Sequence, residues 1–332
     1  MAIGGRGMHG GSVWHRLGGL LLAFMCVVGQ VRAEVAAQPA LKMPLATHVV
    51  FLGLASAGDR VVAVGERGVV IRSDDRGATW IQADVPVRAT LTAVTFVDGQ
   101  TGFAVGHDAV ILKTTDGGTS WSLVNFDPAS QVVLLNVRFR DARNGYVVGS
   151  NGQLWSTQDG GTSWQRRTLA VEDWYQNHIF DIAWLASGPT LAVAEKGVLY
   201  RSEDGLSGFA SVESPYEGSY FGALTLPNAA FLIYGMNGHV FESRDGGISW
   251  NKIQTNTEQF LLDAAILPDG RALIVGAGGT LVVVDASSET AQVVTRPGGA
   301  GINAILIADQ DAYLADLGGG VKKLPLVELL PR

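Results

Sequence analysis

The chain has 332 residues, of which 43 are Gly and 47% are hydrophobic, and it carries 24 Lys and Arg against 31 Asp and Glu. The formal net charge of −7 disfavours nucleic acid and anionic lipid as partners, because both attract cationic surfaces. The single Cys, Cys26, lies in a segment that we expect to be removed, so disulfides do not contribute to the predicted fold.

Residues 1–33 have the pattern of a secretory signal peptide. A basic start precedes the apolar run Leu17–Val28, and Val31-Arg32-Ala33 offers small residues for cleavage. The run is short for a bilayer span, although an uncleaved anchor is the alternative. The residues before Cys26 match a lipobox poorly, which disfavours a lipoprotein. The sequence therefore predicts export to the periplasm or an equivalent thylakoid lumen, with or without membrane association, and a folded domain over 34–332.

An eight-residue motif recurs along the rest of the chain. Residues 114–121 read TTDGGTSW, and the closing aromatics of successive copies stand 41 to 45 residues apart, which is typical of a repeat architecture. The Asp and Ser or Thr side chains can bond amides of their own turn, and the Gly pair supplies positive φ. The motif resembles the Asp box of sialidases and related propellers. Its predicted structural residues are Asp75, Trp80, Asp116, Trp121, Asp159, Trp164, Asp204, Asp245 and Trp250.

A second motif counts the repeats. Each unit contains an apolar strand that ends in Gly, two further residues and usually another Gly, or a near copy, and this occurs seven times, from position 65 to position 316. Within the second unit, alternation and turn residues predict four short strands. These are Leu91–Val97, Gly102–Gly106, Val110–Thr114 and Ser120–Val124. The sequence therefore predicts an all-β, seven-bladed β-propeller of four-stranded antiparallel blades with Asp-box hairpins.

The last unit has room for only three strands, Ile302–Ile307, Ala312–Leu317 and Val321–Leu326. An open ring would leave a sheet edge exposed. Residues 40–44 precede the first inner strand, predicted at Val49–Leu54, and we expect them to supply the missing outer strand of the last blade.

Enzymatic activity is disfavoured by the motifs. A sialidase-like, glycan-active or glycan-binding propeller is the alternative, because sialidases share the Asp box, but their aromatic-Arg-Ile-Pro motif is absent. Tyr216 and Glu217 form a Tyr/Glu pair of the kind such enzymes use, yet neighbours on a strand point apart. His107, His178 and His239 lack metal-ligand spacing. We predict no catalytic residue, no metal, no cofactor and no small-molecule substrate.

Two groups of residues are candidates for partner binding. The first lies on the inner strand of the third unit, where spacing by two places two Arg on one face and could receive a carboxylate or an acidic peptide. The second lies at the joint between the third and fourth units, where exposed aromatics would anchor an interface or pack against the next blade. The candidate residues are Arg138, Arg140, Trp174, Tyr175 and His178, with Asp181 beside the second group.

Taken together, the export signal and the seven repeated units over roughly 45–330 resemble the Ycf48/Hcf136 family of photosystem II assembly or stability factors. The resemblance implies a non-catalytic, lumenal or periplasmic propeller that holds a membrane-protein subunit during assembly. It also implies an Arg-rich patch, for which only Arg138 and Arg140 are counterparts here. We therefore expect a monomeric scaffold whose partner is an integral membrane protein or envelope complex.

Overall fold

A computed structural model describes residues 36–167, 169–170, 177–285, 288–296 and 299–331. Contacts group Ala36–Arg332 into one compact unit, separate from residues Met1–Val35. Within the described ranges, no helix is both long and apolar enough to cross a membrane.

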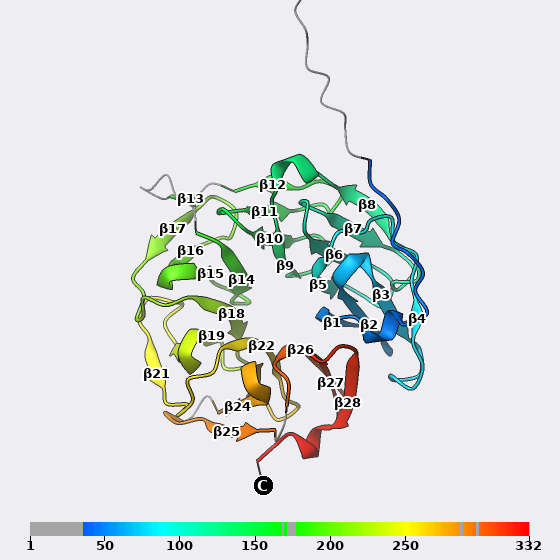
Figure 1. The fold of residues 1–332 in the computed structure, drawn as a ribbon. Helices are drawn as coiled ribbons and strands as arrows, with labels where there is room; N and C mark the ends of the chain where they lie inside the picture. Colours follow the sequence, from blue (N-terminus) through cyan, green and yellow to red (C-terminus); the bar gives the residue numbers. More distant parts are fainter. Residues whose placement is uncertain (1–35, 168, 171–176, 286–287, 297–298, 332) are drawn as a thin grey trace, which may run out of the picture. The chain divides into compact units, whose positions relative to one another are not determined.

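Seven antiparallel sheets stand around a central axis, and Figure 1 looks along that axis. Each sheet is one blade, and its strands follow the chain from the hub outward, except that the short strand Leu169–Ala170 lies at the outer edge of the fourth blade. The strands of the first three blades are β1 (Phe51–Ala57), β2 (Arg60–Gly65), β3 (Val70–Ser73), β4 (Ile81–Gln82), β5 (Leu91–Phe96), β6 (Gly102–Gly106), β7 (Ile111–Thr114), β8 (Ser122–Asn125), β9 (Leu134–Phe139), β10 (Gly145–Gly149), β11 (Leu154–Thr157) and β12 (Gln165–Arg166).

The remaining four blades continue the pattern. Their strands are β13 (Leu169–Ala170), β14 (Ile179–Trp184), β15 (Thr190–Ala194), β16 (Leu199–Ser202), β17 (Phe209–Val212), β18 (Tyr220–Thr225), β19 (Phe231–Gly235), β20 (Val240–Ser243), β21 (Asn251–Ile253), β22 (Leu261–Ile266), β23 (Ala272–Gly276), β24 (Thr280–Val284), β25 (Gln292–Thr295), β26 (Ile302–Ala308), β27 (Asp311–Asp316) and β28 (Val321–Pro325). Single 3-10 turns complete the described elements: η1 (Ala46–His48), η2 (Glu66–Gly68), η3 (Pro128–Ser130), η4 (Glu195–Gly197), η5 (Met236–Gly238), η6 (Ala277–Gly279) and η7 (Leu326–Glu328).

The predicted seven-bladed, all-β propeller is confirmed. The four strands of the second blade lie within two residues of their predicted ends. Two blades depart from the four-stranded pattern. In the fourth, β13 adds a fifth strand parallel to β17, and in the seventh the described sheet has three strands.

Neighbouring blades cover both faces of each second strand, which explains the near-continuous apolar sequence of these strands. Every residue of β6, β10, β15, β19 and β23 is buried. Between the second and third blades, for example, Phe103, Val105 and Val147 belong to one apolar cluster. Burial on both faces is the condition under which a strand loses its polar alternation.

The recurrent Gly-x-x-Gly motif forms the turn between the second and third strands. The last Gly of the motif has positive φ in the first blade, where Gly68 lies at φ 69°. A Cβ on Gly68 would lie 2.1 Å from the carbonyl oxygen of Val87. The first Gly also meets backbone closely, since a Cβ on Gly65 would lie 2.2 Å from the carbonyl oxygen of Val50. Gly is therefore needed at both positions, because the backbone of the turn lies too close to the neighbouring loops to leave room for a Cβ.

The expected exchange of residues 40–44 into the last blade is wrong. The amide of Ala40 donates to the Val85 carbonyl oxygen at 2.9 Å, and Lys42 Nζ donates to the Gln82 carbonyl oxygen at 2.8 Å. In Figure 1 this blue segment runs outside the first blade, beside β4. Ala37 and Ala40 pack against apolar residues shared by the first and second blades, and this packing holds the segment there.

The ring instead closes by contact between the first and seventh blades. Phe51 and Ile71 of the first blade pack with Ala304 and Ala315 of the seventh. The Tyr313 hydroxyl donates to the Arg76 carbonyl oxygen at 3.0 Å, which joins β27 to the Asp-box hairpin of the first blade. The outer edge strand β28 carries exposed Lys side chains, which protect an edge against pairing with other chains.

Candidate functional site

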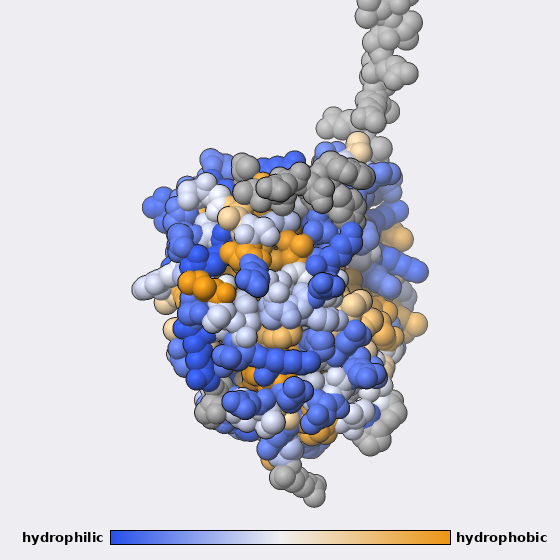
Figure 2. All heavy atoms as spheres, turned by 90° about the vertical axis from the view of Figure 1, so that its left-hand side faces the viewer, coloured by the Kyte–Doolittle hydropathy of each residue, from blue (hydrophilic) through white to orange (hydrophobic). Residues whose placement is uncertain are grey.

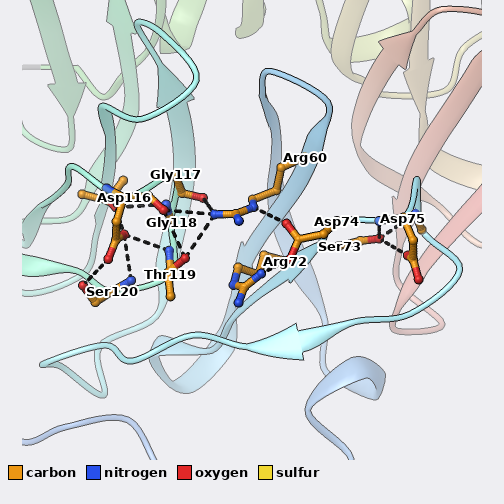
Figure 3. Close-up of polar contacts among 12 residues, drawn as sticks. Arg60, Arg72, Ser73, Asp74, Asp75, Asp116, Gly117, Gly118, Thr119 and Ser120 are labelled. Carbon is orange, nitrogen blue, oxygen red and sulfur yellow. Dashed lines mark hydrogen bonds and ion pairs between the residues drawn. The ribbon is translucent and has the colours of Figure 1, made fainter.

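Each Asp box is a hairpin turn closed by its own carboxylate. In the second blade, Asp116 Oδ1 accepts from the amides of Thr119 and Ser120 at 3.0 Å each, and Oδ2 accepts from the Ser120 hydroxyl at 2.6 Å. The Thr114 hydroxyl donates to Asp116 Oδ1 and accepts from the Gly118 amide. Figure 3 shows this turn and the corresponding turn of the first blade.

These hydrogen bonds stabilise the charged form of the carboxylates. Hydroxyl and amide donors of Thr79 lower the pKa of Asp75 to about 2, and donors of Ser207 lower that of Asp204 to about 2. The pKa values of Asp159 and Asp245 are lowered in the same way by Ser163 and Ser249. Each Asp box therefore holds an ionised carboxylate at the outer rim, engaged with its own turn.

The Asp-box hairpins also join neighbouring blades. Arg60 on β2 lies between two of them in Figure 3, where its Nη1 donates to the carbonyl oxygen of Gly117 at 2.7 Å. Lys113 Nζ donates to the Gly160 carbonyl oxygen at 2.9 Å, and Arg201 Nε donates to the Gly246 carbonyl oxygen at 2.7 Å. These contacts use the boxes to hold the ring together.

Arg138, predicted as a contact for an acidic partner, is bound within the protein. Its Nε and Nη2 donate to the two carboxylate oxygens of Asp181 on β14, at 2.6 and 2.7 Å. Asn136 Nδ2 also donates to Asp181, at 2.8 Å. The Asp181 side chain is 2% exposed and the Arg138 side chain 31% exposed. Sequence spacing placed Arg138 on a face of β9, but only the fold brings its counter-ion from the next blade.

The other predicted contact residues are spread along the blade. Arg140 Nη2 donates to the Ala186 carbonyl oxygen at 2.7 Å, beyond the end of β9. His178 lies near the start of β9, where its Nδ1 accepts from the Asn151 amide at 3.1 Å. These positions are separated by the length of β9, about 20 Å. Trp174 and Tyr175 lie outside the described residues.

The Tyr/Glu pair considered for sialidase-like chemistry lies in the loop before β18. The Tyr216 ring packs edge-on against His239, with ring centroids 4.1 Å apart, and its hydroxyl accepts from Asn237 Nδ2 at 3.1 Å. Glu217 is exposed. This arrangement fixes Tyr216 as a packing residue between two loops.

A cavity of about 660 Å³ runs along the axis of the ring. The second residue of every inner strand lines it, one from each blade. We call these seven residues the hub ring: Leu52, Thr92, Leu135, Phe180, Phe221, Leu262 and Asn303. Five of the seven are apolar and two, Thr92 and Asn303, are polar, so hydrophobic side chains make up most of the lining at this level.

A β-bulge aims each hub-ring residue at the axis. In every pair of first and second strands, the register shifts across the second residue of the inner strand, which is left without a partner. An unpaired bulge residue turns its side chain away from the regular pleat. The ring was not predicted from the sequence, because the bulge interrupts the alternation from which strand faces are read. Aligning the seven repeats at this position is the signal that would have found it.

Exposed apolar residues continue from the hub ring onto one face of the ring. We call it the entry face: it carries the loops that lead into the inner strands and the turns between second and third strands. Phe260 is 42% exposed and its ring centroid lies 5.9 Å from that of Phe221, which in turn lies 5.3 Å from that of Phe180. Leu317, 61% exposed, lies in the turn between β27 and β28 of the seventh blade. By contrast, the side of the ring that carries β17 and β21 is mostly hydrophilic in Figure 2.

Comparison with known proteins gives partial matches in sequence. The family described as photosynthesis system II assembly factor YCF48 matches residues 72–133 and 124–214. Protein YkuO of Bacillus subtilis (strain 168) is 40% identical over 65 residues, and photosystem II assembly lipoprotein Ycf48 of Prochlorococcus marinus (strain NATL2A) is 34% identical over 73 residues. These matches cover 19% and 21% of this chain, and 21% and 22% of the two relatives. The chain thus matches only about a fifth of the length of either relative.

The likeness in fold is more extensive. A solved structure of YCF48 bound to D1 peptide superimposes with a TM-score of 0.68 and 18% identity, covering 88% of this chain and 97% of that one. At this identity the superposition establishes the shared propeller fold.

Proposed function

We propose that this chain, a Ycf48-like propeller in sequence and fold, is an exported, non-catalytic assembly scaffold that binds an integral membrane protein through its entry face. The observation that carries the proposal is the apolar hub ring, which opens beside the exposed Phe260 and Leu317. The relatives support a role in assembly, since one is named as a photosystem II assembly lipoprotein and another was solved with a D1 peptide. Residues 1–33, as a signal peptide, would deliver the propeller to the compartment where such a partner exposes its loops.

The composition of the entry face suits a polypeptide partner. Apolar residues occupy its centre, and the surrounding turns carry polar and charged side chains such as Glu66, Lys196 and Asn237. An apolar centre with a polar rim is the arrangement found at protein interfaces, where the rim excludes water from the central contacts.

The residues expected from sequence fall into two groups under this proposal. His178 leads into β14 at the entry face, and we propose it as a peripheral contact together with Trp174 and Tyr175. Arg138 and Arg140 already engage Asp181 and the carbonyl oxygen of Ala186. We propose that these two arginines stabilise the junction of the third and fourth blades on which the contact surface depends.

Site-specific photo-crosslinking tests the proposal. A photoreactive amino acid at Phe260 or Leu317 should crosslink one membrane polypeptide in intact cells, because both side chains lie at the entry face. The matched control is Ile248, which is 67% exposed but lies on an Asp-box hairpin at the outer rim. Crosslinking of the same polypeptide from position 248 alone, or of none from the entry face, would reject the assignment.

A further inference from the structure

One carboxylate of the hub has no ion-pair partner among the described residues. Asp263 follows Leu262 on β22 and lines the axial cavity. Its Oδ1 accepts from the Ala264 amide and its Oδ2 from the Ile305 amide, both at 2.8 Å. The second bond crosses to the neighbouring blade, so the side chain joins β22 to β26 beside the channel.

Asp181 provides an internal comparison, because it occupies the matching position of β14. Its carboxylate likewise accepts from the next amide of its own strand, Ile182, at 2.8 Å and from the neighbouring blade, Ala223, at 3.0 Å. Asp181 differs in having the guanidinium of Arg138 against both oxygens. The two carboxylates therefore share one backbone arrangement, and among the residues that the structure describes only Asp181 also has a counter-ion.

The surroundings of Asp263 make its negative charge unfavourable. Burial raises the pKa of Asp263 to about 6, partly opposed by its backbone hydrogen bond to Ile305 and the positive charge of Arg138. Asp181 faces the same region and acts on the pKa of Asp263 in the opposite sense to Arg138. Two carboxylates thus share one guanidinium, and Arg138 is held by Asp181 in bidentate geometry. At neutral pH the channel carries an excess negative charge beneath an apolar ring.

We propose that the hub channel receives one basic side chain of the partner polypeptide, whose cationic end pairs with Asp263 while flanking apolar residues contact the hub ring. This inference rests on the proposed function and names the chemistry of the segment that is bound. The carboxylate lies one residue beyond Leu262, which is within reach of the four-carbon stem of a lysine. The stem crosses the hub ring, and the ammonium meets the carboxylate of Asp263, for which the described part of the chain supplies no ion pair.

Peptide titration of the purified protein tests the inference. The probes are a short capped peptide with one Lys flanked by Leu and Phe, and matched peptides with norleucine or Glu in place of the Lys. At about pH 7.5 the Lys peptide should bind about tenfold more tightly than the norleucine peptide, since only the Lys peptide supplies a cation to a partly desolvated carboxylate. The Glu peptide should bind most weakly.

The variant D263N should remove this preference without changing the affinity for the norleucine peptide. Asn keeps the acceptor for the Ala264 amide, as native Asn136 on β9 accepts from the Val137 amide at 2.8 Å. Its Nδ2 cannot accept from the Ile305 amide, so the folding of D263N is checked first. The matched control is D59N, which changes an exposed residue outside the channel. For the wild-type protein, the preference for Lys should also fall about tenfold between pH 7.5 and pH 5, as protonation removes the charge of Asp263.

Equal affinity of the wild-type protein for the Lys and norleucine peptides would overturn the inference, and so would failure to bind any of the peptides. Neither result affects the crosslinking test at Phe260 and Leu317. A crosslinked partner without a preference for Lys would therefore leave the scaffold function standing and reject only the role of Asp263. If D263N unfolds, the peptide series on wild-type protein still decides the question.

Discussion

The carboxylates at the rim and at the hub of the ring accept similar hydrogen bonds, but those at the rim are exposed to solvent and Asp263 at the hub is largely desolvated. At the rim, Asp75 accepts from donors of its own turn in solvent, and its pKa is lowered to about 2. At the hub, Asp263 accepts hydrogen bonds from two backbone amides, but burial raises its pKa to about 6. Hydrogen bonds thus set the direction of the pKa shift at the exposed rim, whereas desolvation outweighs them at the hub.

The rim and hub carboxylates also differ in the sequence distance to their hydrogen-bond partners. The rim carboxylates close turns within eight residues of sequence, so each Asp box is a local unit. The hub carboxylates bond across blades, since the partners of Asp181 include Arg138 and Ala223. Changes at the hub should therefore disturb contacts between blades, whereas changes at the rim should act first on a single hairpin.

The largest expected effect comes from removing the counter-ion at the hub. R138A leaves Asp181 charged and buried, so we expect the free energy of unfolding to fall by about 3 kcal/mol. Chemical denaturation measures the loss. The control R140A removes a guanidinium that bonds to carbonyl oxygens, and it should lower stability by only about 1 kcal/mol. Equal losses for the two variants would show that the buried charge of Asp181 is not the cause.

A smaller effect is expected from breaking one rim turn. D116A removes the acceptor of two amides and two hydroxyls, and we expect a loss of about 2 kcal/mol in the free energy of unfolding. D59A changes an exposed Asp in the turn between β1 and β2 and should stay within about 0.5 kcal/mol of the wild type. Thermal and chemical denaturation compare the two. A loss for D116A no larger than that for D59A would contradict the turn-closing role.

The smallest expected effect is a pH dependence of the free energy of unfolding that differs between the hub and the rim. The pKa of Asp263 is raised from 3.8 to about 6, so the folded state holds this proton more tightly than the unfolded state does. Stability from this group is present at low pH and is lost as pH rises through 6. Between pH 7 and pH 5 the wild type should therefore gain about 1 kcal/mol relative to D263N, measured by denaturation at both pH values.

The rim carboxylates should respond in the opposite direction and at lower pH. Their pKa values lie below 3.8, so the stability they contribute is present above that value and is lost as pH falls toward 2. The wild type and D263N should lose the stability contributed by the rim carboxylates to the same extent as pH falls. A pH-independent difference between them from pH 7 to pH 5 would show that Asp263 does not titrate in this range.

Local sequence was sufficient for most of the fold. The Asp boxes and Gly-x-x-Gly turns are short-range devices whose residues specify their own backbone, so the seven repeats, the strand limits of the second blade and the propeller class followed from them. Ring closure did not, because residues 40–44 contain nothing that distinguishes the outer side of the first blade from that of the seventh. Side-chain packing of Ala37 and Ala40 made that choice.

The site depended on tertiary structure for a different reason. Arg138 lies on β9 and Arg140 directly follows it, but whether their charges are available depends on Asp181 and Ala186 in the next blade. The hub ring and the position of Asp263 on the axial cavity exist only where seven inner strands converge, with one bulge residue from each turned to the axis. A single repeat specifies its blade through contacts close in sequence, whereas the channel is made of contacts among all seven.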